Sequence, residues 1–228
     1  MNKFSTLTSQ TKTTIKTYFS AFLIMLMLFF VFLMVRITIP YLSFRTDVNF
    51  LLTKQNVIHL SIWRQAFYIH IALSTFVLLV GIFQFVKPII RKWPKTHRLL
   101  GKIYIILVLL FCAPSGFVMA LYANGGFWAR TSFVITASLW WLFTFLAYKN
   151  ARDKQFKLHI ANMYRSYAMT LTAISLRLYV LILPHFIHLH SSQMYTLVAW
   201  LSWIPNLIIA ELLIRKWKIN GSLIPVKG

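Results

Sequence analysis

Arg177 is the residue whose chemistry most needs an explanation, because it is a cation inside an apolar stretch. It lies within Ile160–Pro184, a segment long enough to cross a bilayer. The whole chain has three acidic residues, Asp47, Asp153 and Glu211, against 24 lysines and arginines. A cation at the centre of a membrane costs about 2.5–3.5 kcal/mol on insertion scales and normally marks a functional site. We therefore expect Arg177 to face a negative group that the protein does not encode.

Polar residues recur on one face of three predicted helices. At 100° per residue, helical positions 18 apart lie on the same face, which aligns His159 with Arg177. The three predicted stripes are His159, Ser166, Thr170, Ala173 and Arg177; His70, Gly81 and Gln84; and His97, Tyr104 and Ser115. Polar stripes on neighbouring membrane helices indicate a site in the interior of a bundle.

The same residues divide into two layers by depth. His97 and His159 belong to the predicted cytoplasmic ends of their helices, with Arg98 and Arg165 close by. His70 and Arg177 each lie about one turn inside the opposite ends. Four further histidines could join this outer layer, namely His59 and the turn cluster His185, His188 and His190.

Six apolar stretches must position these side chains. They are Phe19–Val35, Ala66–Val86, Ile103–Ala123, Thr131–Tyr148, Ile160–Pro184 and Met194–Ile214. Each is near the roughly 20 residues that an α-helix needs to cross about 30 Å of hydrocarbon. We therefore predict an all-α polytopic transmembrane bundle of about six helices. Pro114 and Pro205 are expected to kink two of them.

The distribution of basic residues predicts the orientation. Lysines and arginines concentrate at 87–102, 149–157 and 215–218, whereas the turns at 124–126 and 184–193 have almost none. The positive-inside rule then places both termini in the cytoplasm. The exceptions lie in the first outer loop and are Arg36, Arg45, Lys54 and Arg64. No cleavage site follows the first stretch, which favours an uncleaved anchor over a signal peptide.

These boundaries suggest three units. Residues 1–64 would form an N-terminal anchor helix and outer loop, and residues 65–184 a core four-helix membrane domain. Residues 185–228 would form a C-terminal membrane helix and a basic tail.

Composition excludes several classes of protein. Hydrophobic residues make up 59% and mean hydropathy is +0.69, which argues against a soluble globular domain. The formal charge of +21 lies between apolar runs and fits anionic lipid headgroups better than nucleic acid. The single cysteine, Cys112, excludes an internal disulfide and a cysteine-based metal site. Paired catalytic carboxylates, a Gly-rich phosphate loop and a nucleophile elbow are all absent.

Several motifs in order resemble a known family. They are His70, Gly81–Phe85, His97–Tyr104, Trp140 or Trp141, Arg152-Asp153, His159–Ala168 and Leu176–Leu178. From His70 to Leu178 the chain resembles an uncharacterised family of bacterial integral-membrane proteins, domain of unknown function 2306. The family has Arg and Trp-Met after its last histidine, where this chain has Ile160–Met163. The resemblance implies a helical multi-pass protein of the bacterial cytoplasmic (inner) membrane and no established activity.

The histidines carry the first functional hypothesis. Paired histidines on facing helices are the usual axial ligands of a b-type haem, and arginines suit its propionates. His97 and His159 would bind the haem iron, and Arg98 or Arg165 the propionates. An outer haem would need His70 and a second ligand that the sequence does not assign. The possible small-molecule partners are an anionic ligand or a quinone. The full cofactor-binding set is His70, His97, His159, Arg98, Arg165, Arg177 and Gln84.

Two other classes of function stay open, and the sequence does not decide whether the protein is an enzyme. A transporter or lipid- and anion-binding protein without a redox cofactor would use Arg177 and His70. A structural membrane subunit would have no site, with His97 and His159 as interfacial caps and Arg177 bonded to helix carbonyls or lipid phosphate. Zinc or copper binding by the cluster at His185, His188 and His190 is a minor alternative.

Overall fold

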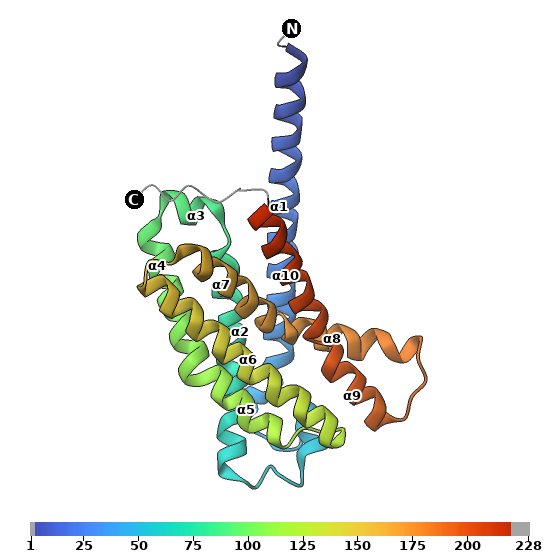
Figure 1. Ribbon diagram of the computed structural model, residues 1–228. Coiled ribbons are helices and arrows are strands. Elements are labelled where there is room, and N and C mark those ends of the chain that lie inside the picture. Colours follow the sequence, from blue (N-terminus) through green and yellow to red (C-terminus); the bar gives the residue numbers. More distant parts are fainter. Residues whose placement is uncertain (1–2, 220–228) are drawn as a thin grey trace.

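The part of the chain that a computed structural model describes, residues 3–219, contains helices and turns and no strand; side chains are described for Thr14 and from Thr17 to Trp217. The elements in order are α1 (Lys3–Thr38), η1 (Ile39–Ser43), η2 (Asn49–Lys54), α2 (Ser61–Gln84), α3 (Lys87–Lys92), α4 (Pro94–Ile106), the π-helical segment η3 (Leu107–Cys112), α5 (Ala113–Leu121), α6 (Gly126–Arg152), α7 (Phe156–Thr170), α8 (Thr172–Ile182), η4 (Leu183–His185), α9 (Ser191–Leu201) and α10 (Ile204–Ile219). Figure 1 shows most of these helices running side by side.

Six helical segments of the described chain are long and apolar enough to cross a membrane, which confirms the predicted number. They are Thr17–Ser43, Ser61–Gln84, Pro94–Leu121, Gly126–Arg152, Phe156–His185 and Ser191–Trp217. Every segment starts before the apolar stretch that predicted it, because a helix continues through the headgroup region where polar residues are tolerated. Large apolar side chains such as Phe22, Leu110 and Leu181 are exposed along the spans. Lipid accepts such a surface, whereas water disfavours it.

The helix α2 lies at the centre of the packing. It contacts α1, α4, η3 and α5, while α6 packs along α7 and α10 covers α7. In Figure 1 the helices α8 and α9 form a hairpin that projects sideways from the other helices. The hairpin is attached mainly through α9, which packs on α6. The side chains of α8 therefore have fewer protein neighbours than those of α2.

Gly81 permits the closest approach inside the bundle. A Cβ atom at this position would lie 2.7 Å from Cδ2 of Tyr167 and 3.2 Å from Cε2 of Tyr104. The Tyr167 hydroxyl donates to the carbonyl of Leu78 at 3.2 Å, so this ring is fixed against α2. Small residues at such crossings let membrane helices approach and gain van der Waals contact.

Two prolines alter their spans, as the sequence predicts. Pro114 follows the π-helical segment Leu107–Cys112. Since proline has no N–H, the Leu109 carbonyl loses a donor one π-helical turn later, and the Trp141 indole donates to it instead at 3.2 Å. The sixth span is interrupted between α9 and α10, directly before Pro205.

The fifth span is interrupted at Leu171, between α7 and α8, where no proline is present. The straight-helix extrapolation from His159 to Arg177 therefore fails after Thr170. Ser166 and Thr170 are buried, whereas the Arg177 side chain is exposed. The prediction that Arg177 continues an inward stripe is wrong for this reason.

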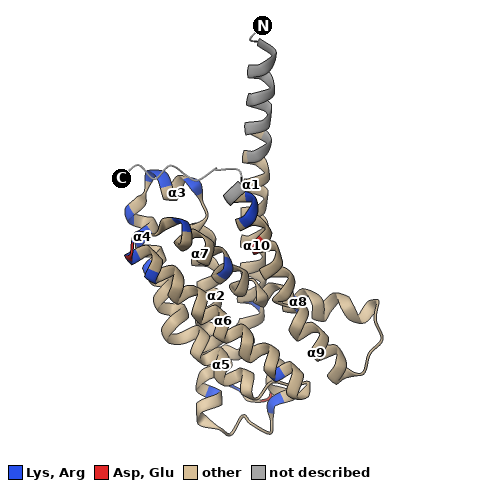
Figure 2. Cartoon of the chain, in the orientation of Figure 1, with Lys and Arg blue, Asp and Glu red and all other residues tan. Residues whose placement is uncertain are grey.

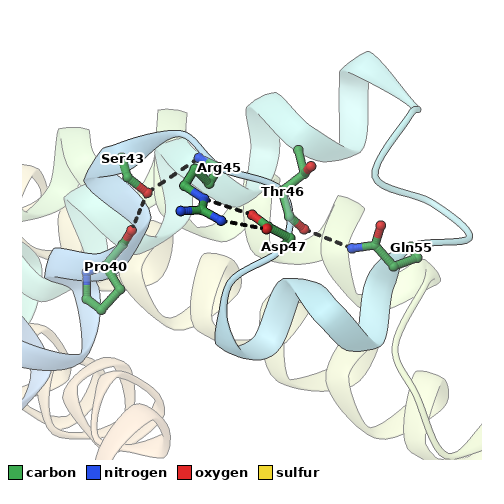
Figure 3. A network of polar contacts seen from close by, with 6 residues as sticks. All are labelled: Pro40, Ser43, Arg45, Thr46, Asp47 and Gln55. Atoms are coloured by element: carbon green, nitrogen blue, oxygen red, sulfur yellow. Dashed lines mark hydrogen bonds and ion pairs between the residues drawn. The ribbon is translucent and has the colours of Figure 1, made fainter.

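The segment between the first two spans folds over one end of the bundle. Its side chains hold it together by local bonds, which Figure 3 shows. The Arg45 guanidinium forms a bidentate pair with Asp47, at 2.7 and 3.0 Å, and lowers the pKa of this exposed carboxyl. The Gln55 amide donates to the carbonyl of Thr46 at 2.8 Å. Two of the cations that depart from the positive-inside pattern, Arg45 and Lys54, thus have partners in the protein.

Lys54 is the buried cation of this segment. Its side chain is 4% exposed, and Nζ donates to the Tyr122 carbonyl at 2.6 Å and to Asn124 Oδ1 at 2.7 Å. Both acceptors are neutral. Burial and the nearby Arg130 lower the pKa of Lys54 from 10.5 to about 8. Lys54 therefore fastens η2 to the turn between α5 and α6.

Basic residues gather most densely at the other end of the bundle (Figure 2). We call this the basic end; it consists of α3, the start of α4, the end of α6 and the start of α7. The opposite end consists of η1, η2 and the turn between α5 and α6. Figure 1 shows α1 starting, and α10 finishing, on the side of the basic end, as an even number of spans requires.

The Gly81→Ala substitution should destabilise the bundle. Its methyl group would displace the rings of Tyr167 and Tyr104, and overpacking of this kind typically costs about 1–3 kcal/mol. Helix propensity would offset about 1 kcal/mol of that cost. The measurement is the apparent melting temperature of detergent-purified protein. Ala72→Leu is the matched control, because Ala72 is an exposed residue of the same helix. Equal melting temperatures for Gly81→Ala and the unmodified protein would contradict the close approach.

Lys54 should make stability rise with pH between about 8 and 10.5. In this window the unfolded lysine binds a proton that the folded one has released, so deprotonation favours the folded state. Below pH 8 both states are protonated and the cost of burying the charge is constant. We expect melting temperature to increase less steeply with pH in Lys54→Gln than in the unmodified protein. The exposed Lys95 provides the control Lys95→Gln, which should keep the original slope; identical slopes in all three proteins would refute the assignment.

Candidate intramembrane site

His97 and His159 lie at the basic end of two different spans. Each lies three residues after the start of its helix, α4 or α7, which is about 4.5 Å of helix rise. The His159 Nδ1 lies 2.8 Å from the carbonyl oxygen of Ala147. Because a carbonyl can only accept, Nδ1 carries the proton and Nε2 keeps a lone pair for a metal ion or a donor.

Two buried polar atoms in this region have no hydrogen-bond partner among the described residues. They are Nδ1 of His97 and Nε2 of Gln84. Gln84 ends α2, and its side chain lies against Gly101, one turn along α4 from His97. An unsatisfied buried donor costs about 1–3 kcal/mol, so a molecule that bonded to these atoms would recover that energy. The basic end of the interior thus offers two unsatisfied polar atoms, one in His97 and one in Gln84 near it.

The two arginines predicted beside these histidines differ in their surroundings. Arg98 is exposed on α4. Arg165 is half-buried and forms a bidentate pair with Glu211 of α10, at 2.5 Å from Nε to Oε1 and 3.0 Å from Nη2 to Oε2. It also donates to Asn162 Oδ1 at 3.0 Å. Arg165 therefore has a carboxylate inside the chain, and its predicted role toward a propionate stays a prediction.

A cluster of hydroxyl groups fills the centre of the bundle. The Tyr104 hydroxyl lies 2.9 Å from Ser166 Oγ and 2.7 Å from Thr170 Oγ1. Ser166 Oγ lies 2.7 Å from Thr144 Oγ1, and that group donates to the carbonyl of Trp140. All these side chains are buried. The cluster links α4, α6 and α7 by hydrogen bonds in the buried centre of the bundle.

His70 lies on the other side of this cluster. Its Nδ1 lies 2.9 Å from the Cys112 carbonyl, at the end of the π-helical segment, and its ring contacts Trp140 at 6.5 Å between centroids. The Trp140 indole nitrogen is buried beside the Tyr104 hydroxyl but outside hydrogen-bond geometry. Polar and aromatic side chains therefore continue from His70, through Trp140 and Tyr104, to Thr144. Thr144 lies one turn along α6 from Ala147, whose carbonyl bonds His159.

Arg177 is separate from both histidines of the basic end. Its Nη1 donates to the Ala173 carbonyl at 2.8 Å, and its side chain is exposed. The two ion pairs of the described side chains are Arg45–Asp47 and Arg165–Glu211, and neither includes Arg177. The expectation that Arg177 faces a negative group from outside the chain stays a prediction.

The remaining histidines do not join these groups. His59, His185, His188 and His190 are exposed. Throughout the described residues, no group of three or more His, Cys, Asp or Glu side chains could hold a metal ion. The sequence placed Tyr104, Ser166 and Thr170 on polar stripes and Trp140 among the family motifs, as an alternative to Trp141. It did not indicate Thr144 or the pairing of Arg165 with Glu211. Thr144 lies in the Thr131–Tyr148 stretch, where a signal existed: it is one turn after Trp140 in an otherwise apolar run.

Together, six apolar spans around buried polar side chains define a polytopic helical membrane protein. The chain belongs to the family described as Predicted membrane protein (DUF2306), whose sequence profile matches residues 67–214. The match continues past Leu178 through α9 and into α10, so it covers more of the chain than the predicted resemblance. No curated protein and no solved structure matches the chain.

Glu211→Gln should destabilise the protein by about 2 kcal/mol. It leaves the half-buried Arg165 guanidinium without its carboxylate, and a fully buried pair would lose about 3–5 kcal/mol. The double variant Arg165→Met, Glu211→Leu should recover much of this loss, because neither charge remains. The exposed pair provides the control Asp47→Asn, expected to cost less than about 1 kcal/mol. The measurement is thermal unfolding in detergent; a double variant no more stable than Glu211→Gln would contradict the pairing.

Proposed function

We propose that this protein is an electron-transfer protein of the membrane that binds a b-type haem between His97 and His159. The observation that carries the proposal is the position of these two imidazoles near the starts of α4 and α7, at the same end of two different spans, with the His159 Nε2 free to ligate iron. Haem would supply one-electron chemistry. Its propionates are carboxylates, and they would supply negative charge to a chain that has 24 lysines and arginines but three acidic residues.

The residues around the two histidines fit such a group. Nδ1 of His97 and Nε2 of Gln84 are buried atoms that lack partners among the described residues. The amide of Gln84 could donate to a propionate or to another oxygen at the edge of the ligand. Of the two arginines predicted as propionate partners, Arg98 is the one for which the structure describes no carboxylate, since the guanidinium of Arg165 bonds Glu211. Arg98 is therefore the preferred propionate partner.

We further propose that the basic end faces the cytoplasm of a bacterial cell and that the membrane is the cytoplasmic one. The support is the density of lysines and arginines on α3, α4 and the turn between α6 and α7. Anionic headgroups of that leaflet would attract the same residues. The haem would then lie near the cytoplasmic surface, where a soluble or membrane-bound electron partner, including a quinone, could reach it.

A second candidate is an anion- or lipid-binding protein without a redox cofactor. The observation that favours it is Arg177, an exposed guanidinium inside a membrane span with one backbone carbonyl as its described acceptor. This candidate makes no use of His97 and His159.

The visible absorption spectrum of detergent-purified protein tests the haem proposal. Protein from haem-supplemented cells should show a Soret band and, after dithionite reduction, a sharp band of reduced b-type haem. His97→Ala and His159→Ala should each lose these bands while eluting as a single species on size exclusion. His59→Ala is the control, because His59 is exposed and outside the spans, and it should keep them. A colourless unmodified protein, or bands that survive both substitutions, would overturn the proposal.

A further inference from the structure

The turn between α5 and α6 is bonded by two cations from different parts of the chain. Lys54 Nζ donates to the Tyr122 carbonyl and to Asn124 Oδ1, at 2.6 and 2.7 Å. Arg130 Nε donates to the carbonyl of Ala123, the residue between them, at 3.2 Å. Consecutive residues are about 3.8 Å apart along the chain. The ammonium of η2 and the guanidinium of α6 therefore bond to three adjacent residues of one turn.

The acidic residues of the chain lie elsewhere or are already paired. The full sequence has three of them. The carboxylate of Asp47 is paired with Arg45, and that of Glu211 is paired with Arg165. Asp153 follows the last residue of α6, about 40 Å of helix from the first. The two cations of the turn are thus left with neutral acceptors.

Both cations keep N–H donors for which the described structure gives no acceptor. An ammonium has three such groups and Lys54 uses two, whereas a guanidinium has five and Arg130 uses one. Lys54 is 4% exposed, and the Phe50 ring, 5.4 Å from Nζ, gives it a cation–π contact but no negative charge. A buried ammonium without an anion is costly, so a ligand with negative oxygens would offset that cost.

The turn is fixed by further hydrogen bonds, so its two cations are held in place. Asn124 Nδ2 donates to Thr53 Oγ1 at 3.1 Å, which orients Oδ1 toward Lys54. From α9, the Thr196 hydroxyl donates to the carbonyl of Gly125 at 3.0 Å. The helix α6 begins directly after the turn, with no capping side chain and no acidic residue in its first turn. Its N-terminus adds partial positive charge to that of the two side chains.

We propose that Lys54 and Arg130 together bind one phosphate group at the end of the bundle opposite the basic end. Phosphate oxygens accept from both kinds of cation, and such charge-assisted bonds are about twice as strong as neutral ones. Arg130 is exposed, so the phosphate can arrive from solvent or as the headgroup of an anionic lipid. Phe127 and Trp128 are exposed at the start of α6, and aromatic residues favour headgroup depth. The site is separate from Arg177 and from the histidines of the haem proposal.

Thermal unfolding of delipidated protein in a nonionic detergent at pH 7 tests the site. Inorganic phosphate, or phosphatidylglycerol added in mixed micelles, should raise the melting temperature of the unmodified protein by about 2–4 °C. Arg130→Gln should lose most of this shift, and because Arg130 is exposed the variant should still fold. Arg64→Gln is the matched control, since Arg64 is an exposed cation near the start of α2, at the same end; it should keep the shift.

The two ligands distinguish the sources of the phosphate. A shift with inorganic phosphate that Arg130→Gln removes supports a site for a free oxyanion. A shift with phosphatidylglycerol alone, removed by the same substitution, supports a site for a lipid headgroup. No shift with either ligand, or a shift of equal size in Arg130→Gln and the unmodified protein, would overturn the proposal.

The pH dependence of melting gives a second readout, which a purely structural lysine would not change. A bound phosphate favours the charged form of Lys54 and raises its pKa from about 8 toward 10.5. The increase in melting temperature between about pH 8 and 10.5 should therefore shrink at saturating ligand in the unmodified protein and persist in Arg130→Gln. A slope that saturating ligand leaves unchanged would refute the role of Lys54. Neither experiment depends on whether the preparation contains haem.

Discussion

Polar groups inside hydrocarbon find no water to bond, and this constraint governs the interior of the bundle. The structure meets it with hydrogen bonds between different spans: Tyr104 to Ser166 and Thr170, Ser166 to Thr144, and Tyr167 to the carbonyl of Leu78. Each of these bonds joins two helices, so the same contacts also set how the helices pack. Gly81 brings α2 close enough for the two tyrosine rings to fit against it.

The groups that stay unsatisfied are informative because so many others are paired. A carbonyl freed by Pro114 receives the Trp141 indole, and the half-buried Arg165 receives Glu211. Six buried side-chain atoms of the described residues lack a partner. Two of them, in His97 and Gln84, and the exposed guanidinium of Arg177 lie in two places. One is at the basic end, between α2, α4 and α7, and the other is on the lipid-facing side of α8. The two candidate functions rest on these leftover polar groups.

Hydropathy was sufficient to predict the all-helical fold and the six spans, because length and apolar composition alone decide whether a helix can cross a bilayer. Helical periodicity also placed Ser166, Thr170 and Tyr104 on inward faces. It failed at Arg177, because the helix is interrupted at Leu171 and α8 turns away from α7. The sequence has no proline or glycine there that would predict an interruption. Pairings between distant spans, such as Arg165 with Glu211, depend on how the helices pack around each other. The periodicity of a single helix does not predict that packing.

The central claim is that His97 and His159 share one externally supplied ligand. Electron paramagnetic resonance of the oxidised purified protein tests it most directly, because the signal of ferric haem reports the axial ligands of the iron. We expect a low-spin signal typical of two imidazole ligands, and its conversion to a high-spin signal, or its loss, when either histidine is replaced. Absence of any haem iron signal from haem-supplemented protein, or a low-spin signal unchanged in both variants, would contradict the account.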